Sequence, residues 1–364
     1  MPLGKTEGFD AQVDLFLPPM TSLPIRDQRE MMERPFFAIT KSKRTKPIIY
    51  RSPCGRIQVH VSGNSEYGIA TIYDLDILIY CASLLIEQKR AGVKEIPQTL
   101  SIIPYDLLKT IRRHPSGRAY ELLGQALDRL QSTTVKTNIR AVDEVERTFS
   151  WIDSYTQLRD SKTGQIKGMR ITLSKWFYEG VLMEGGVLAI DPSYFDLEGP
   201  TERWLYRVAR KHAGGWGSKG FSINLPTLFE KSGSDAIYRK WKAKLKALVQ
   251  DPSFALPGYS VHWLERSNQE PQLHLVRDSE ERLLDGDIAA PVPQVDAVPS
   301  FPSGSIRFSP FSAIAQANLP HPQPDHGGVA NAFRAWCQRK GIPLQSHSIC
   351  ETFAGFCRTQ HPAD

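Results

Sequence analysis

The sequence has no long apolar run, since no segment approaches the roughly eighteen consecutive apolar residues of a membrane-spanning helix. Its N-terminus also lacks the basic stretch followed by an apolar stretch that marks a secretory signal. These absences argue against helical membrane spans and against secretion. We therefore expect a cytoplasmic protein without a membrane partner.

Cysteine is scarce, and the five cysteines are odd in number and contain no Cys-x-x-Cys pair. This argues against a disulfide framework and against a zinc knuckle. Cys350 and Cys357 would share one helix face with His347 nearby, so a metal site there is the alternative. Free cysteine is more often a small buried apolar residue, and we expect no bound metal.

Catalytic and nucleotide-binding motifs are also missing. The sequence contains no GxxxxGK[ST] phosphate loop, and no His-x-His pair of the kind that holds the metal of nicking initiators and relaxases. GWGSKG at 215–220 matches GxGxxG, but it follows a predicted helix and precedes a predicted strand, the reverse of a dinucleotide-binding turn. Acidic pairs such as Asp74 with Asp76 have no His or Lys at a spacing that would indicate a catalytic site. We expect neither enzymatic activity nor a cofactor.

Length and charge limit what remains. A chain of 364 residues with 41% apolar content is too long for one small core, so two or three domains are expected. The net charge of +6 and the pI near 9.0 favour an acidic partner such as nucleic acid without establishing it. One basic cluster stands close to the N-terminus and consists of Lys41, Lys43, Arg44 and Lys46.

The first half of the sequence predicts a winged helix-turn-helix domain over residues 35–185, after a flexible tail over residues 1–34. The predicted order is helix, short strand, two further helices and strands that end in a hairpin. The elements are helices over 72–90, 104–113 and 116–131, and strands over 100–103, 133–141, 149–159 and 168–177.

The same order repeats over residues 186–278, which predicts a second winged helix. Its elements are helices over 201–212, 226–231 and 234–250, and strands over 221–225, 259–266 and 272–277. A proline-rich linker follows over 279–327, and then a small helical C-terminal segment over 328–364. The predicted fold class is α+β, with two tandem winged helix-turn-helix domains, a Pro-rich linker and a short helical C-terminal segment.

The strongest charge pattern is YRKWKAKLKAL at residues 238–248, which is amphipathic as a helix. Its apolar stripe consists of Ile237, Trp241, Leu245 and Leu248. A basic solvent-exposed face is the alternative, but the third helix of a winged helix is the one that enters the major groove. The predicted DNA contacts are Tyr238, Arg239, Lys240, Lys242, Lys244 and Lys246.

The corresponding helix of the first domain has acidic residues on its outer face, and these would repel a duplex. Only its start and the residues just before it suit phosphate contact at a helix N-terminus. The hairpin tip is a candidate wing that contacts the minor groove or phosphates. The predicted contacts are Arg112, Arg113, Ser116, Arg118, Tyr120, Lys162, Lys167 and Arg170. The second domain should therefore read bases, while the first touches the DNA backbone, pairs with another subunit, or does both.

Three segments resemble the plasmid replication initiator protein A family of bacteria. They are ERPFFAITKSKR at 33–44, GIATIYDLDILIYCAS at 68–83 and SGRAYELLGQALDRLQSTTVKTNI at 116–139. The resemblance implies a non-enzymatic initiator that binds double-stranded DNA at repeated origin sites called iterons and is associated with plasmid DNA in the nucleoid. It also implies opening of an AT-rich region with the host initiator and loading of the replicative helicase. The resemblance further implies that many members exist as dimers that repress their own promoter and as monomers that bind the origin, so a homodimer and a monomer are both open for this chain.

QVDLF at 12–16 resembles the QLxLF peptide by which several replication proteins bind the DNA polymerase sliding clamp. An extended peptide places Leu15 and Phe16 in an apolar pocket while Gln12 hydrogen-bonds at its rim, and the prolines that follow disfavour a helix. A tail packed on its own domain is the alternative. The expected clamp-binding residues are Gln12, Val13, Asp14, Leu15 and Phe16.

Two other functions compete with the initiator. A transcriptional regulator would use the same fold and the same basic helix, but it would bind a palindrome as a dimer, whereas an initiator binds directly repeated sites. A nuclease or relaxase is disfavoured by the missing metal ligands.

Overall fold

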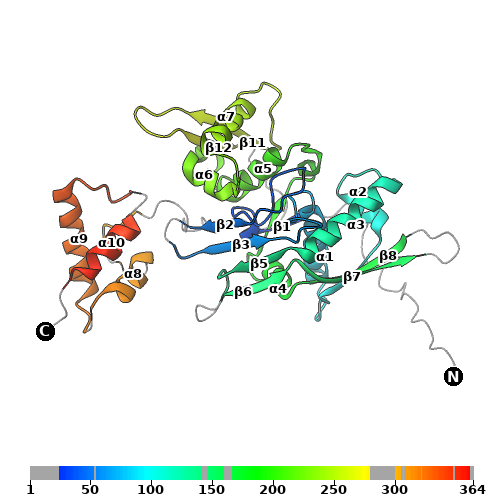
Figure 1. Ribbon diagram of the computed structural model, residues 1–364, viewed down its shortest axis with the longest axis horizontal. Helices are drawn as coiled ribbons and strands as arrows, with labels where there is room; N and C mark the ends of the chain where they lie inside the picture. The colour runs from blue at the N-terminus through cyan, green and yellow to red at the C-terminus, as the bar shows by residue number, and fades with distance from the viewer. Residues whose placement is uncertain are drawn as a thin grey trace. The chain divides into compact units, whose positions relative to one another are not determined.

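The computed structural model describes residues 24–52, 55–141, 146–159, 166–278, 300–304, 306, 309–320, 322–346 and 349–360. Over these residues the protein is a mixed α+β chain, as predicted (Figure 1). The described residues fall into two compact units. The larger unit contains two repeats of one order of elements. The smaller contains segments from residues 49–59 and 137–146 and the C-terminal helices, and these helices are called the C-terminal unit below.

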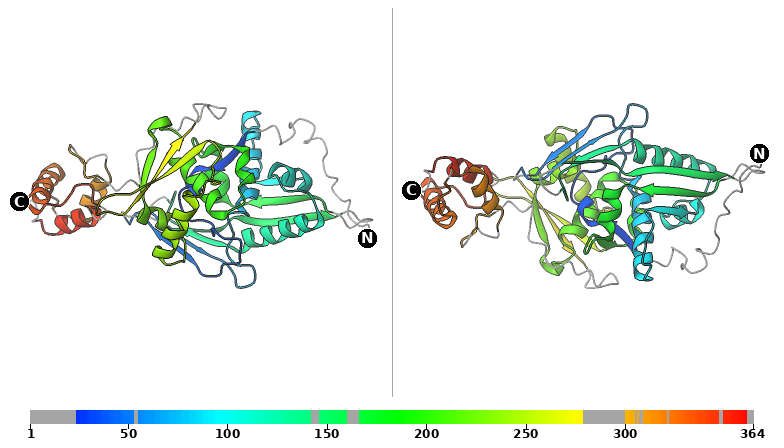
Figure 2. Two further views of the ribbon diagram at one scale, coloured as in Figure 1. Left: turned by 90° about the horizontal axis from the view of Figure 1, so that it is seen from above. Right: turned by 90° about the horizontal axis from the view of Figure 1, so that it is seen from below.

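The first repeat has the predicted order of helices and strands. Its elements are α1 (Leu75–Arg90), β4 (Thr99–Ile102), α2 (Pro104–Thr110), α3 (Gly117–Ser132), β7 (Ile152–Arg159) and β8 (Ile166–Leu173). Pro104 occupies the first turn of α2, where its missing N–H costs no hydrogen bond. The Ser116 hydroxyl accepts a hydrogen bond from Ala119 N at 3.3 Å and caps α3 as predicted. The strands form an antiparallel sheet in the order β4-β8-β7, and α3 packs along the long β7–β8 hairpin (Figure 2).

Residues 24–34 belong to the folded protein, which corrects the prediction of a flexible tail through residue 34. β1 (Ile25–Gln28) pairs antiparallel with β9 (Val187–Ile190), and all four of its residues are buried. Arg26 N donates to Ser83 Oγ of α1 at 2.9 Å. Three of the four residues in β1 are polar, and hydropathy alone predicts no buried strand here. The neighbouring elements are η2 (Arg29–Met31), α4 (Lys175–Leu182) and η3 (Pro192–Asp196).

A second sheet has the strand order β2-β3-β5-β6. Its strands are β2 (Ile48–Arg51), β3 (Gln58–Ser62), β5 (Thr134–Thr137) and β6 (Arg147–Ser150). Directly after β6, Trp151 is fully buried and stacks on Phe37 at a centroid distance of 4.7 Å, with Phe36 edge-on at 5.7 Å. The Phe36–Phe37 pair therefore ties the N-terminal segment to the core, since buried aromatic pairs add to the free energy of area burial.

The second repeat copies the first in element order and in sheet order. Its elements are α5 (Pro200–His212), η4 (Gly217–Lys219), β10 (Phe221–Asn224), α6 (Leu225–Ser232), α7 (Tyr238–Val249), β11 (Tyr259–Leu264) and β12 (Gln272–Arg277). The sheet order β10-β12-β11 corresponds to β4-β8-β7. Gly233 ends α6 with φ at +58°, a conformation that favours glycine, and so makes the sharp turn into α7. The β11–β12 hairpin packs against α7 (Figure 1).

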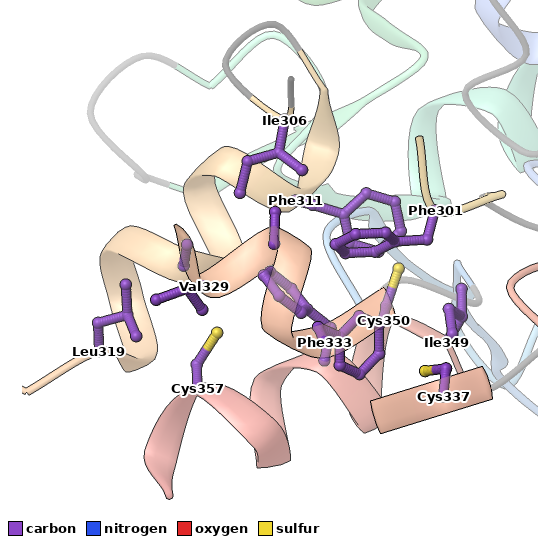
Figure 3. Packing of buried hydrophobic residues seen from close by; sticks show 13 residues of the cluster. Phe301, Ile306, Phe311, Leu319, Val329, Phe333, Cys337, Ile349, Cys350 and Cys357 are labelled. Atoms are coloured by element: carbon purple, nitrogen blue, oxygen red, sulfur yellow. The ribbon is translucent and has the colours of Figure 1, made fainter. Parts of the chain in front are cut away.

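The C-terminal unit corrects the prediction of a linker that extends to residue 327. It comprises α8 (Pro310–Asn318), α9 (His326–Lys340) and α10 (Ile349–Arg358). Phe301 is buried among Phe311, Phe333 and Phe353, with ring centroids 4.6, 4.7 and 4.8 Å away. Figure 3 shows the rings of Phe301, Phe311 and Phe333 in this cluster. The proline content is misleading here because Pro310 stands in the first turn of α8 and starts a helix. The part of the predicted linker over 279–299 lies outside the described residues.

The cysteines of the C-terminal unit belong to this apolar core. Cys337, Cys350 and Cys357 are buried in the aromatic cluster. Burial raises the pKa of Cys357 to about 11, so its thiol stays protonated at neutral pH. His347, the third member of the alternative metal site, lies outside the described residues.

Candidate nucleic-acid interface

The apolar face of α7 is fixed against the rest of the second repeat. Trp241 and Leu245 are buried, and the Trp241 ring lies edge-on to Phe229 of α6 at 5.2 Å and to Trp204 of α5 at 6.4 Å. Ile237, which the sequence places in the same stripe, is instead 67% exposed. It precedes the helix with an extended backbone, so helical periodicity does not apply to its side chain.

Three of the predicted DNA-binding residues of α7 are exposed cations. These are Arg239, Lys240 and Lys244. Because Trp241 and Leu245 are buried, the orientation of the helix about its axis is fixed, and these three side chains stay in solvent. At about 100° per residue, Lys240 and Lys244 are neighbours on the helix surface and Arg239 lies about 100° away from Lys240, so the exposed cations cover a broad part of this surface. Such a surface suits phosphates and the acceptor edges of bases.

Two other predicted contacts, Lys242 and Lys246, form ion pairs with glutamates of the β11–β12 connection, the segment between these two strands. Lys242 Nζ donates to Glu270 Oε2 at 2.7 Å, and the Tyr238 hydroxyl donates to the same oxygen at 2.8 Å. Lys246 Nζ donates to Glu265 Oε1 at 2.7 Å. The hydrogen bonds from these lysines lower the pKa of each glutamate, so both carboxylates are charged at neutral pH. A phosphate that binds Lys242 or Lys246 must therefore compete with a glutamate.

Arg112 and Arg113 of the first repeat are both engaged within the protein. Arg113 Nη2 donates to the buried Asp76 Oδ2 at 2.8 Å and to Tyr73 O at 2.9 Å. Arg112 has a positive φ of 54° and forms an ion pair with Asp196 of η3. Either arginine would have to leave an intramolecular partner to bind phosphate, and their contact with DNA stays a prediction.

At the start of α3, Arg118 is the cation that lies in solvent. It pairs with Glu121 at 2.9 Å, but the two side chains are 67% and 65% exposed, so this pair contributes little to stability. The hydroxyl of Ser116 caps the helix, and Tyr120 is half-buried. The acidic outer face predicted for α3 includes Asp128, which accepts a hydrogen bond from the Tyr155 hydroxyl at 2.6 Å.

The remaining predicted contacts fall at or beyond the edge of the described chain. Arg170 is exposed on β8, and Lys167 lies in the same strand. Lys162 at the hairpin tip lies outside the described residues. So do Gln12, Val13, Asp14, Leu15 and Phe16, and the structure therefore does not test the clamp motif.

The arginines of α5 are important residues that the sequence analysis did not single out. Arg203 Nη1 donates to both Asp76 oxygens at 2.7 and 2.8 Å, and Arg207 Nε donates to Asp27 Oδ2 at 2.6 Å. Arg210 Nε donates to Ala189 O at 2.6 Å. The three arginines are buried and share one helix face at i, i+4 and i+7. Their spacing was visible in RWLYRVARKH, and it joins α5 of the second repeat to α1, β1 and β9.

Glu33 is the centre of a second buried charge cluster. Its carboxylate lies 3.3 Å from His212 Nε2, 3.5 Å from Lys231 Nζ and 3.8 Å from Lys211 Nζ. Burial alone would raise the pKa of Glu33, but the surrounding positive charges outweigh burial and lower it. Burial also lowers the pKa of His212 to about 3, although Glu33 opposes this shift. His212 is therefore neutral in the folded protein and stacks on Phe221 at 4.9 Å.

Acidification from pH 7 to pH 5 should destabilise the protein through His212. The folded-state pKa is about 3 and the ordinary value is 6.5. In this pH range only the unfolded chain takes up the proton, so stability is lost as the pH falls below 6.5. The loss from this group at pH 5 should be about 2 kcal/mol. Urea unfolding at both pH values measures it. His212→Gln should reduce the loss, whereas the control His114→Gln, at an exposed histidine, should not.

None of the helices in the described ranges has the length and apolar character needed to span a bilayer. Residues 26–261 match the family model described as Replication initiator protein A. A curated protein of Wigglesworthia glossinidia brevipalpis, "Putative replication protein", is 33% identical over 241 residues, which cover 65% of this chain and 84% of that protein.

Two crystal structures of RctB domains 2 and 3 are similar to the chain. The first has a TM-score of 0.48 at 15% identity and covers 67% of this chain and 95% of its own. The second has a TM-score of 0.42 at 14% identity and covers 66% of this chain and 94% of its own.

Proposed function

Because the chain belongs to the replication initiator protein A family, we propose that it initiates replication by binding double-stranded origin DNA through α7. The observation that carries this proposal is the group of exposed cations on α7, a helix whose orientation is fixed by the buried Trp241. The two repeats are winged helices in this proposal, and α7 is the recognition helix of the second. A recognition helix enters the major groove and contacts base edges.

The finer steps follow from the same proposal. The protein binds directly repeated origin sites, opens an adjacent AT-rich region with the host initiator and recruits the replicative helicase, without enzymatic activity or a cofactor of its own. As a homodimer it represses its own promoter. Footprinting over its own upstream DNA tests the first step, and protection of direct repeats beside an AT-rich segment is the expected result.

A dimeric transcriptional regulator is the second candidate, because its fold and basic helix would be the same. The footprint separates the two functions. Protection of one palindrome alone, with no protected repeats and no strand opening beside them, would favour the regulator.

We expect Leu15→Ala with Phe16→Ala to abolish binding to the bacterial sliding clamp. The two apolar side chains fill the pocket in a QLxLF-type complex, and their loss leaves only polar contacts. Affinity for purified clamp, measured by surface plasmon resonance, tests this, and origin binding should be unchanged. Asp14→Ala, at the position that tolerates any residue, is the matched control. Equal clamp affinity of the double variant and the wild type would contradict the linear peptide.

A further inference from the structure

The basic loop, defined here as residues 39–47, lies against the turn that leads into α7. Arg44 Nη1 donates to Gly233 O in that turn at 2.7 Å, and Arg44 Nε donates to Lys46 O at 2.9 Å. One guanidinium therefore joins the first part of the chain to the second repeat and also closes the loop on itself.

The chain on both sides of the basic loop packs on the same turn. A Cβ added at Gly233 would lie 2.5 Å from Pro35 Cβ and 2.8 Å from Ile48 Cγ2. Pro35 precedes the loop and Ile48 follows it, so close packing as well as a hydrogen bond fixes the loop beside α7. This arrangement gives the loop a defined position relative to the recognition helix.

Two of the four basic residues in this loop form hydrogen bonds within the protein, and the other two are exposed. Lys43 Nζ donates to Ser65 O at 2.9 Å and to Glu66 O at 3.1 Å, and Arg44 holds the turn. Lys41 and Lys46 are exposed. The nearby acid in the turn, Asp235, interacts with Arg44. Two lysines are thus presented to solvent by a loop that the other two basic residues hold in place.

We propose that the basic loop is a second DNA-binding element, in which Lys41 and Lys46 contact backbone phosphates beside the groove that α7 occupies. This rests on the proposed function of α7. The turn before a recognition helix lies at the edge of the major groove, where the phosphates flank the helix. Arg239 and Lys240, the first exposed cations of α7, follow Gly233 closely in the chain. Arg44 is a positioning residue, and the partner is duplex DNA just outside the base pairs that α7 reads.

Titrations of the full chain with two duplexes test the proposal. One duplex ends at the base pairs that α7 protects in a footprint, and the other extends by about one helical turn, roughly 10 base pairs, on each side. Lys41→Ala with Lys46→Ala should weaken binding to the longer duplex at least tenfold and lower its salt slope by about two, since each phosphate contact contributes about 0.9. Affinity for the shorter duplex should be unchanged, and Lys41→Arg with Lys46→Arg should restore the longer one.

The controls separate the basic loop from α7 and from net charge. Lys94→Ala with Lys136→Ala removes the same charge from two exposed lysines elsewhere, and an equal loss there would overturn the proposal. Arg44→Lys keeps the charge but replaces the planar guanidinium, whose Nε and Nη1 reach Lys46 O and Gly233 O from two separate nitrogens, with a single nitrogen that lacks this geometry. It should therefore reduce binding to the longer duplex, and full retention would overturn the positioning role of Arg44. If the loop variant binds normally while Arg239→Ala with Lys240→Ala does not, the loop proposal fails and the role of α7 stands. If neither weakens binding, the role of α7 fails as well.

Discussion

Replacement of Asp76 by alanine should lower the free energy of unfolding by about 3–5 kcal/mol, because it leaves buried arginine charge without its partner. The carboxylate is fully buried and accepts hydrogen bonds from Arg203 and from Arg113. Arg203 is 5% exposed, so water cannot replace the lost partner. Urea unfolding of the full chain, followed by circular dichroism and by tryptophan fluorescence, measures the change.

The matched control for Asp76 is an ion pair on the surface. Glu121→Ala breaks the exposed pair with Arg118 and should change stability by less than about 1 kcal/mol. Changing Asp76 and Arg203 together to apolar residues should recover part of the loss, because no unpaired charge then remains between them. A loss below about 1 kcal/mol for Asp76→Ala would mean that the two repeats do not depend on this pair.

Replacement of Arg239 by alanine should weaken binding to origin DNA by about 1–3 kcal/mol and relax the preference at one base pair. This assumes that its guanidinium donates to both acceptors of a guanine edge. Lys240→Ala and Lys244→Ala should weaken binding on all sequences and lower the salt slope by about 0.9 each. Titrations against origin and scrambled duplexes at several salt concentrations separate base contact from phosphate contact.

Two further variants complete the test of α7. Lys242→Ala and Lys246→Ala should cost less than Lys240→Ala, because each lysine already has a glutamate partner in the free protein. Trp241→Ala should instead unfold the repeat, since the ring packs on α5 and α6. Folded variants of Arg239, Lys240 and Lys244 with wild-type affinity on both duplexes would mean that α7 does not read DNA.

Elements that local patterns define were predicted well from the sequence. α3 and α7 show an apolar stripe at helical spacing, Ser116 gives a capping signal, and Gly233 marks the turn between two helices. In these elements the residues that decide the structure lie within a few positions of one another, so the sequence contains the necessary information.

Long-range ion pairs explain several features that the sequence did not predict. β1 is buried although it is mostly polar, because Asp27 forms an ion pair with Arg207, which lies far along the chain. The partners of Arg113 and Glu33 are also far away in the sequence, so they could not be predicted from local patterns. The pairing of Lys242 and Lys246 with the β11–β12 connection also depends on the folded hairpin. A helical wheel shows which face a lysine occupies, but not the acid that meets it.

The glutamates of the β11–β12 connection affect the number of phosphate contacts that is deduced from the salt dependence of DNA binding. When a lysine leaves Glu265 or Glu270 for a phosphate, DNA releases a condensed cation, but the abandoned carboxylate attracts cations from solution in its place. The net number of cations released is therefore smaller for such a contact than for one made by Lys240 or Lys244. The number of phosphates deduced from the salt slope will be smaller than the number touched, by up to the two lysines that start out paired.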